Sequence, residues 1–277
     1  MYNSAQENKS KWFTATRVRN IAYWAATAII IWGTALGSIW DLARESVVKT
    51  IMSQLGYPFY FITIMGFWKV LAVIALLVPG FGRIKEWAYA GLFFVYTGAF
   101  ISNLAVGHIN DAFGPAIFAA ILIASWALRP ASRRLVSSRA DIANSRSTKT
   151  KTIFYWITTS MLFLCLISGG IGELGHLWGT LQTVTLLGYP AYFLSIIGSW
   201  KLLACLTILI SRFPRLKEWA YAGVFFVMTG AATSHLVCHD YGPGGAHIIV
   251  TLFFAALTLA SWALRPASRS QLIIGYF

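Results

Sequence analysis

Charged residues are scarce in this chain. Asp, Glu, Lys and Arg supply only 11% of its 277 residues, whereas hydrophobic residues supply 57%. A soluble domain carries roughly a quarter charged residues, and the mean hydropathy here is +0.65. The composition excludes a soluble globular protein and predicts an integral membrane protein in the lipid bilayer. The net charge of +13 does not indicate a nucleic-acid partner, because no soluble domain is present to gather basic residues on one face.

Cysteine is also rare, and the three cysteines, Cys165, Cys205 and Cys238, form no Cys-x-x-Cys pair. This disfavours thiol–disulfide exchange, which needs such a pair near the membrane surface. The sequence contains no Gly-rich phosphate loop, no serine nucleophile elbow and no Cys/His protease arrangement. Any chemistry must therefore come from the few polar side chains that lie among apolar ones.

Long hydrophobic runs are abundant. A membrane-spanning helix needs roughly twenty apolar residues, and strands that span a membrane would need alternating polarity, which these runs lack. The pattern predicts an all-α protein with eight transmembrane helices. Their expected ranges are 20–40, 58–79, 87–106, 113–128, 153–173, 190–210, 219–238 and 247–264.

The two halves of the chain are copies of one another. Leu55-Gly56-Tyr57-Pro58 recurs as Leu187-Gly188-Tyr189-Pro190, 132 residues later. Each copy carries four spans, and because four is even, the copies are parallel repeats. The predicted units are a tail, a first four-helix bundle, a basic linker, a second four-helix bundle and a C-terminal tail. Their boundaries are 1–19, 20–129, 130–152, 153–266 and 267–277.

Basic residues are distributed unevenly along this map. Of the 22 Lys and Arg residues, 18 fall on the side that holds both termini and the linker. Basic loops stay in the cytoplasm, so we expect both termini to be cytoplasmic and the protein to be a multi-pass protein of the plasma (inner) membrane. Lys85-Glu86-Trp87 and Trp126-Ala127-Leu128-Arg129 are expected at that boundary, with their charges in water. The same is expected of their repeats, Lys217-Glu218-Trp219 and Trp262-Ala263-Leu264-Arg265.

A family resemblance follows from several motifs. They are Leu-Gly-Tyr-Pro, Gly66 with Lys69 (Gly198 with Lys201), Lys-Glu-Trp-Ala-Tyr-Ala-Gly, Ser234-His235-Leu236 followed by Asp240, and Ser-Trp-Ala-Leu-Arg-Pro. The chain resembles two fused copies of the DoxX-like family of four-helix membrane proteins. The resemblance implies the fold. It also suggests an activity, because some members are linked to quinone-coupled sulfur oxidation, although many have no known role. The first half departs from the pattern, with Asn103 where the second has His235.

Each half carries one lysine inside a span and one carboxylate at the outer end of its first span. Asp41 and Glu173 are equivalent positions, as are Lys69 and Lys201. Charges within a membrane are rare and often functional, so we expect the pairs Asp41–Lys69 and Glu173–Lys201 inside the bundles. One interpretation is charge neutralisation. The other is catalytic: a lysine that acts as acid or base, or that holds a ligand oxygen.

Histidines are concentrated in the second half. Glu173 and His176 have the Glu-x-x-His spacing that carboxylate bundles use for iron or manganese, and His235 and His239 are four residues apart. We expect these four residues to form a metal site, with Asp240 and His247 near it. Imidazole and carboxylate suit iron, copper, zinc or manganese. The alternatives are polar surface residues of a loop, or a proton relay between His235 and Glu173.

These features favour a membrane oxidoreductase, or a subunit of one, that handles a lipophilic redox partner such as a quinone at the outer side of the second bundle. In this hypothesis Lys201 holds a ligand oxygen, while Glu173 and His235 move protons. Trp200 and Tyr189 form aromatic walls. The alternatives are a non-catalytic carrier, a protein that binds a lipid or small molecule, and a structural subunit of a membrane enzyme. A homo-oligomer is compatible with each.

Overall fold

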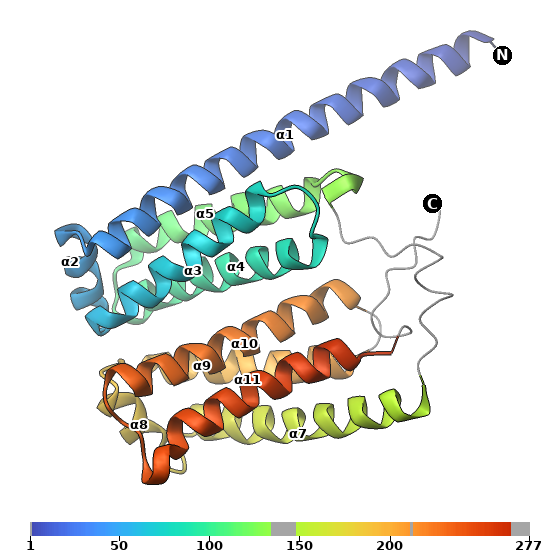
Figure 1. Cartoon of the computed structure of the whole chain (residues 1–277). Helices are drawn as coiled ribbons and strands as arrows, with labels where there is room; N and C mark the ends of the chain where they lie inside the picture. The colour runs from blue at the N-terminus through green and yellow to red at the C-terminus, as the bar shows by residue number, and fades with distance from the viewer. Residues whose placement is uncertain (1, 134–147, 211–212, 267–277) are drawn as a thin grey trace.

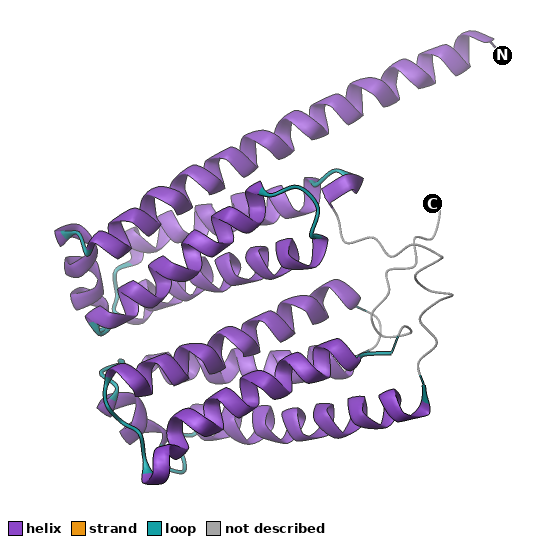
Figure 2. Cartoon of the chain, in the orientation of Figure 1, coloured by secondary structure: helices purple, strands orange, loops and turns teal. Residues whose placement is uncertain are grey.

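The computed structural model describes residues 2–133, 148–210 and 213–266, and every regular element in these ranges is a helix (Figure 2). Eight helices are long and apolar enough to cross a membrane, which confirms the eight predicted spans. They are α1 (Tyr2–Ala43), α3 (Phe59–Leu77), α4 (Gly82–Ala105), α5 (Ile109–Leu128), α7 (Lys149–Leu174), α9 (Tyr192–Leu209), α10 (Pro214–Val237) and α11 (Ala246–Leu264).

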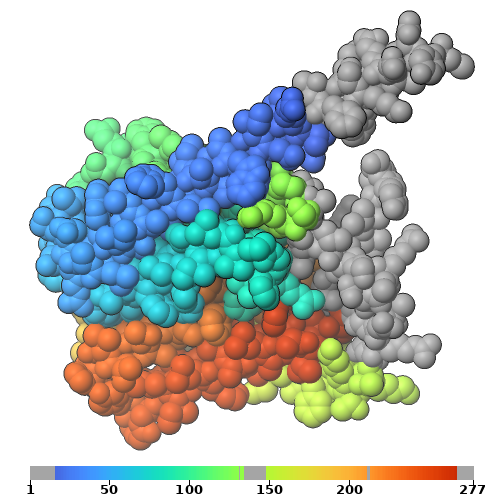
Figure 3. Space-filling view, turned by 45° about the horizontal axis from the view of Figure 1, so that its top comes forward, coloured from blue at the N-terminus to red at the C-terminus, as the bar shows by residue number. Residues whose placement is uncertain are grey.

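The eight helices form two bundles. Helices α1, α3, α4 and α5 make the first bundle, and α7, α9, α10 and α11 make the second (Figure 1). The helices α1 and α7, which open the two bundles, begin at the same end of the molecule and run in the same direction, so the repeats are parallel (Figure 1). Helices α4 and α10 pack against each other, and the two bundles lie in direct contact in the space-filling view (Figure 3).

In each bundle, one short helix follows the first helix. The hydrophobic pattern predicted neither of them. They are α2 (Ser46–Leu55) and α8 (Thr180–Leu186). The Leu-Gly-Tyr-Pro motif begins at the last residue of α2 and directly after α8, and its glycines Gly56 and Gly188 have φ of +74° and +79°. A left-handed glycine ends a helix at low cost, and a proline after it favours the start of the next one. The repeated motif therefore makes a sharp corner.

Helix boundaries differ from the prediction at the start of each bundle. Helix α1 begins at Tyr2, so it includes most of the predicted N-terminal tail. Helix α7 begins at Lys149, within the predicted linker, and its first turn is capped by the side chain of Thr148, which accepts a hydrogen bond from the Lys151 amide. The middle of the linker and the C-terminal tail, 134–147 and 267–277, lie outside the described residues.

Small polar side chains connect the helices inside each bundle. In the first bundle, the hydroxyl of Ser125 is 2.8 Å from those of Thr27 and Tyr89. In the second bundle, Ser261 forms the same contacts with Thr159 and Tyr221, at 2.8 and 2.9 Å. Polar groups in lipid need internal partners, and these hydroxyls provide them for one another in both copies.

Candidate functional site

Each bundle contains a lysine–carboxylate ion pair, as predicted. Lys69 Nζ lies 2.7 Å from Asp41 Oδ2 in the first bundle, and Lys201 Nζ contacts Glu173 Oε1 in the second. The side chains of Lys201 and Glu173 are 12% and 10% exposed, so the pair is largely enclosed. Both ammonium groups therefore face a carboxylate in their own bundle instead of the lipid.

The second pair has hydrogen-bonding capacity that it does not use. A lysine ammonium has three N–H donors, and within the described residues Lys201 directs one of them to Glu173. The other carboxylate oxygen, Glu173 Oε2, is buried and has no hydrogen-bond partner among the described residues. A buried acceptor without a partner is costly unless a ligand or a proton forms a hydrogen bond with it. This pair is therefore suited to binding a ligand or a proton.

A second set of charges was expected in water and is instead buried. Glu86 and Glu218 are 0% and 1% exposed. Within its own bundle, Glu86 pairs with Arg129 at 2.7 Å and Glu218 pairs with Arg265. The expectation that these charges lie in water was wrong, because partners within each bundle and packing between the repeats cover the carboxylates.

The buried carboxylates also cross between the bundles. Glu86 accepts a hydrogen bond from the indole of Trp219 in the second bundle, and Glu218 accepts one from Trp87 in the first, both at 3.1 Å. The two contacts are related by the repeat. We call Glu86 and Glu218 the inter-bundle carboxylates. They join the two copies at the end where the basic residues gather.

Lys85 was likewise expected in water, and it is only 1% exposed. Its ammonium donates to the carbonyls of Ala75 at 2.8 Å, Leu76 at 3.3 Å and Val78 at the end of α3. The last carbonyls of a helix lack partners within the helix. The lysine therefore caps α3.

Tyr189, predicted to form a wall of the site, lies in an aromatic cluster between the bundles. Its ring stacks on Phe193 with centroids 4.8 Å apart and meets Tyr57 of the first bundle edge-on at 6.2 Å. Its hydroxyl is 2.8 Å from the hydroxyl of Ser234, the residue before His235. Burial raises the pKa of both Tyr57 and Tyr189, so both are neutral phenols.

Trp200, the other predicted wall, is turned away from the ion pair. Its ring packs across the interface against Phe93 and Phe94, with centroids 5.9 and 5.0 Å away. Neighbouring positions on a helix face different directions, so Lys201 points into its own bundle while Trp200 points to the other one. The contacts of Trp200 therefore stabilise the interface.

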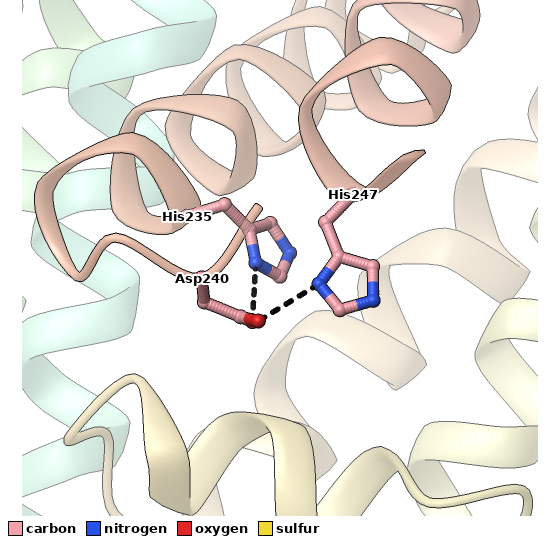
Figure 4. A group of neighbouring side chains, drawn as sticks. All are labelled: His235, Asp240 and His247. Atoms are coloured by element: carbon pink, nitrogen blue, oxygen red, sulfur yellow. Dashed lines mark hydrogen bonds and ion pairs between the residues drawn. The ribbon is translucent and has the colours of Figure 1, made fainter. Parts of the chain in front are cut away.

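Three of the polar side chains where α10 leads into α11 come together (Figure 4). His235 Nδ1 lies 2.9 Å from Asp240 Oδ2, and His247 Nδ1 lies 3.0 Å from Asp240 Oδ1. The two imidazole centroids are 5.0 Å apart. His235 comes from the last turn of α10, Asp240 from the loop, and His247 from the first turn of α11. We call these residues the His–Asp–His cluster.

The carboxylate of this cluster is ionised at neutral pH. Burial acts to raise the pKa of Asp240, but the hydrogen bond from His235 and the charge and hydrogen bond of His247 act against it. The net effect is a pKa below the ordinary value for Asp. The cluster therefore presents an anionic oxygen between two imidazole nitrogens.

The structure does not assemble the predicted metal site from Glu173, His176, His235 and His239. Helix α10 ends at Val237 and His239 has φ +55°, so His235 and His239 no longer share a helix face. His239 Nδ1 instead contacts the Tyr241 hydroxyl at 2.7 Å. Helix α7 ends at Leu174, and His176 has φ +52°, so it leaves the face that carries Glu173. Glu173 pairs with Lys201.

The four predicted ligands include His235 but neither Asp240 nor His247, which were expected only near the site; of these two, His247 is the more distant in sequence from His235. Its contact with Asp240 depends on the loop that joins α10 to α11, and the available signal was the adjacency of Asp240 to His239 and of His247 to a glycine-rich turn. Within the described residues, His235, Asp240 and His247 are the group whose candidate metal ligands lie within 4.8 Å of one another.

Comparison with known families supports the duplication. The sequence model of the DoxX-like family matches residues 25–125 and again residues 157–261. The two matches cover most of the chain and fall on the two bundles. Comparisons with curated proteins and with solved structures found no match. The chain therefore belongs to the DoxX-like family, as a tandem duplication of its unit.

Proposed function

We propose that the protein is an oxidoreductase of the plasma (inner) membrane, or a subunit of one, that handles a lipophilic carbonyl compound such as a quinone. In this proposal both termini are cytoplasmic and the site lies at the outer side of the second bundle. The observation that carries it is the enclosed Lys201–Glu173 pair with its unpartnered carboxylate oxygen.

The pair offers two complementary groups to a quinone. The remaining N–H donors of Lys201 can form hydrogen bonds with a carbonyl oxygen. These hydrogen bonds become stronger as negative charge develops on that oxygen during reduction. Glu173 Oε2 suits the hydroxyl of a quinol or a proton in transit. Electrostatic interactions are stronger in a low-dielectric interior, so the apolar bundle strengthens the interactions of this pair with a quinone.

The position of the pair suits a ligand that arrives from the bilayer. Lys201 is nine residues into α9, about 14 Å along the helix at 1.5 Å per residue. Glu173 lies one residue before the outer end of α7. An apolar ring and tail can reach this depth from the lipid, whereas a charged solute would first lose its hydration.

Quinone reduction consumes two electrons and two protons. We propose that Glu173 delivers the protons, because it lies at the pair and near the end of α7, where water can supply a new proton after each transfer. The electrons come from a reduced substrate or from a partner oxidoreductase. The protein's own residues therefore hold the quinone and supply its protons.

A titration of a short-chain quinone into the protein in lipid nanodiscs tests the proposal. The double variant Lys201→Met/Glu173→Gln removes both charges without leaving one unpaired. A hydrogen bond to a charged group contributes about 1.5–3 kcal/mol, so binding should weaken at least tenfold. The matched control, Lys69→Met/Asp41→Asn, should keep the wild-type affinity. Equal affinity in the wild type and the Lys201/Glu173 variant would overturn the proposal.

The redox part has its own test. Quinone-dependent electron transfer in membranes that carry the chain should fall at least tenfold in the Lys201→Met/Glu173→Gln variant and persist in the first-bundle control. Tight quinone binding without any electron transfer would leave a quinone-binding protein and remove the oxidoreductase assignment.

The packing between the bundles disfavours a carrier that works by rocking one repeat against the other. The interface is closed at one end by the inter-bundle carboxylates. At the other end, Tyr60 donates to the Leu187 carbonyl at 2.7 Å and Tyr192 to the Leu55 carbonyl at 2.6 Å. Rocking would break both sets of contacts. Saturable transport of a solute into vesicles, without redox turnover, would favour the carrier instead.

A further inference from the structure

The loop between α10 and α11 is longer than its counterpart in the first bundle. Asn103 and His235 are 132 positions apart, but Ser125 and Ser261, on the following helices, are 136 apart. The second bundle therefore has four more residues than the first between these positions. The additional length falls in the loop where the His–Asp–His cluster forms.

The glycines of this loop bring His247 to Asp240. Gly242, Gly244 and Gly245 all have positive φ, at +65°, +61° and +80°. A Cβ on Gly242 would lie only 2.7 Å from Cδ2 of His247, so a side chain there would collide with the imidazole ring. Glycine thus permits both the turn and the close approach of the ring, and the loop is shaped around the cluster.

The distances within the cluster match those between neighbouring ligands of one metal ion. Metal bonds to imidazole nitrogen and carboxylate oxygen are about 2.0–2.2 Å long, so ligands at right angles are about 3 Å apart. The two Nδ1–carboxylate distances are 2.9 and 3.0 Å. All three ligand atoms lie within 4.8 Å of one another. A small cation between them needs only modest side-chain adjustment.

We infer that His235, Asp240 and His247 bind a divalent first-row transition metal ion at the outer end of the second bundle. Imidazole nitrogen selects iron, cobalt, nickel, copper and zinc over magnesium and calcium. Two imidazoles and one carboxylate leave further coordination positions open for water or another ligand. The ionised Asp240 supplies one negative charge, which offsets part of the charge of the cation.

The exposure of the three side chains gives the site a closed side and an open side. The side chains of His235 and Asp240 are 9% and 14% exposed, whereas that of His247 is 41% exposed. The first two are fixed by the bundle, and the third borders the solvent. A metal ion can therefore enter at His247, where its open coordination positions also face.

The first bundle supplies a natural control. Its loop ends at His108, and Asp111 lies in the first turn of α5; their Nδ1 and Oδ2 are 3.9 Å apart, with side chains 37% and 72% exposed. Asn103 occupies the position of His235 and donates to the Ala99 carbonyl at 2.9 Å. One imidazole and one exposed carboxylate do not make a comparable site.

Cobalt binding to the full chain in nanodiscs tests the inference. Co²⁺ bound by nitrogen and oxygen ligands gives visible d–d absorption, and Zn²⁺ should displace it. We expect one Co²⁺ per chain, with binding at least tenfold weaker in His247→Ala and in Asp240→Asn. The variants His108→Ala and His239→Ala should bind as the wild type does.

Two results would overturn the inference: no stoichiometric Co²⁺ binding, or unchanged binding in His247→Ala and Asp240→Asn. His247 is half exposed, so its truncation leaves the bundle folded, and a size-exclusion profile confirms this. The readout is metal binding, and it is independent of quinone. Failure of this test and failure of the proposed function are therefore distinguishable.

Discussion

In the first bundle a lysine pairs with an aspartate, and in the second the equivalent lysine pairs with a glutamate. Asp41 and Glu173 are both largely buried, but only the longer glutamate has a buried oxygen without a hydrogen-bond partner among the described residues. The loops between the last two helices of each bundle differ more, since the second has the longer turn and two imidazoles on one carboxylate. The two copies share a scaffold, and the second copy alone carries the features on which the proposed quinone and metal sites rest.

The regions in which the bundles agree are those that hold them together. The inter-bundle carboxylates and the tyrosine–carbonyl contacts occur in equivalent pairs, one from each copy. An interface between parallel repeats of this kind has approximate twofold symmetry, so each contact is made twice. Variants in these regions should therefore have equal effects on stability in the two halves, whereas ligand binding should differ between the halves.

The largest expected effect is loss of an inter-bundle carboxylate. Glu218→Ala removes the carboxylate that pairs with the buried Arg265, and Glu86→Ala removes the one that pairs with Arg129. Breaking a buried ion pair costs about 4 kcal/mol, so both variants should lose thermal stability in detergent by similar amounts. A large loss in one variant alone would show that the two halves are not equivalent at this interface.

Next in size is the effect of breaking a lysine–carboxylate pair. Lys201→Met should destabilise the protein by about 3 kcal/mol, because Glu173 is left buried and charged. The double variant Lys201→Met/Glu173→Leu should recover most of this loss, since well-packed apolar side chains often replace a buried pair at little cost. Lys69→Met should behave in the same way in unfolding experiments. A double variant as unstable as the single one would argue against the ion pair.

Zinc should stabilise the protein through the His–Asp–His cluster of the second bundle, and not through the first bundle. A ligand at about 100 times its dissociation constant adds roughly 2.7 kcal/mol to the free energy of unfolding. The melting temperature of the wild type should therefore rise when Zn²⁺ is added, and the rise should persist in His108→Ala and disappear in His247→Ala. An equal rise in both variants would place the metal elsewhere.

The smallest expected effect concerns the tyrosine–carbonyl contacts between the bundles. Tyr60→Phe and Tyr192→Phe each remove one hydrogen bond to a carbonyl of the other bundle, worth about 1 kcal/mol. The two losses should be equal within error and additive in the double variant, as measured by thermal unfolding. No loss in either variant would show that lipid or water replaces these contacts.

The fold follows from the sequence because its signals are strong and local. Long apolar runs locate the spans, and the constant offset of 132 residues pairs Lys69 with Lys201 and Asp41 with Glu173. The carboxylate ends the first span and the lysine lies within the second, so their ion pairs were predictable. The short helices α2 and α8 were not, because neither is long enough to stand out in a hydropathy pattern.

The parts that sequence did not predict depend on tertiary contacts. Lys85-Glu86-Trp87 has the composition of a membrane boundary, but contacts from Arg129 of the same bundle and from Trp219 of the other enclose Glu86. His239 is at helical spacing from His235, yet the helix ends between them and the longer glycine turn brings His247 to Asp240 instead. Helix ends and loop conformations set these distances, and spacing along the chain does not record them.

The central claim is that the two bundles share a scaffold while the second alone carries the ligand sites. Native mass spectrometry of the intact chain, loaded with a short-chain quinone and with Zn²⁺, counts the bound molecules directly. We predict one quinone and one metal ion per chain. Two quinones per chain, one in each bundle, or none at all, would contradict this account.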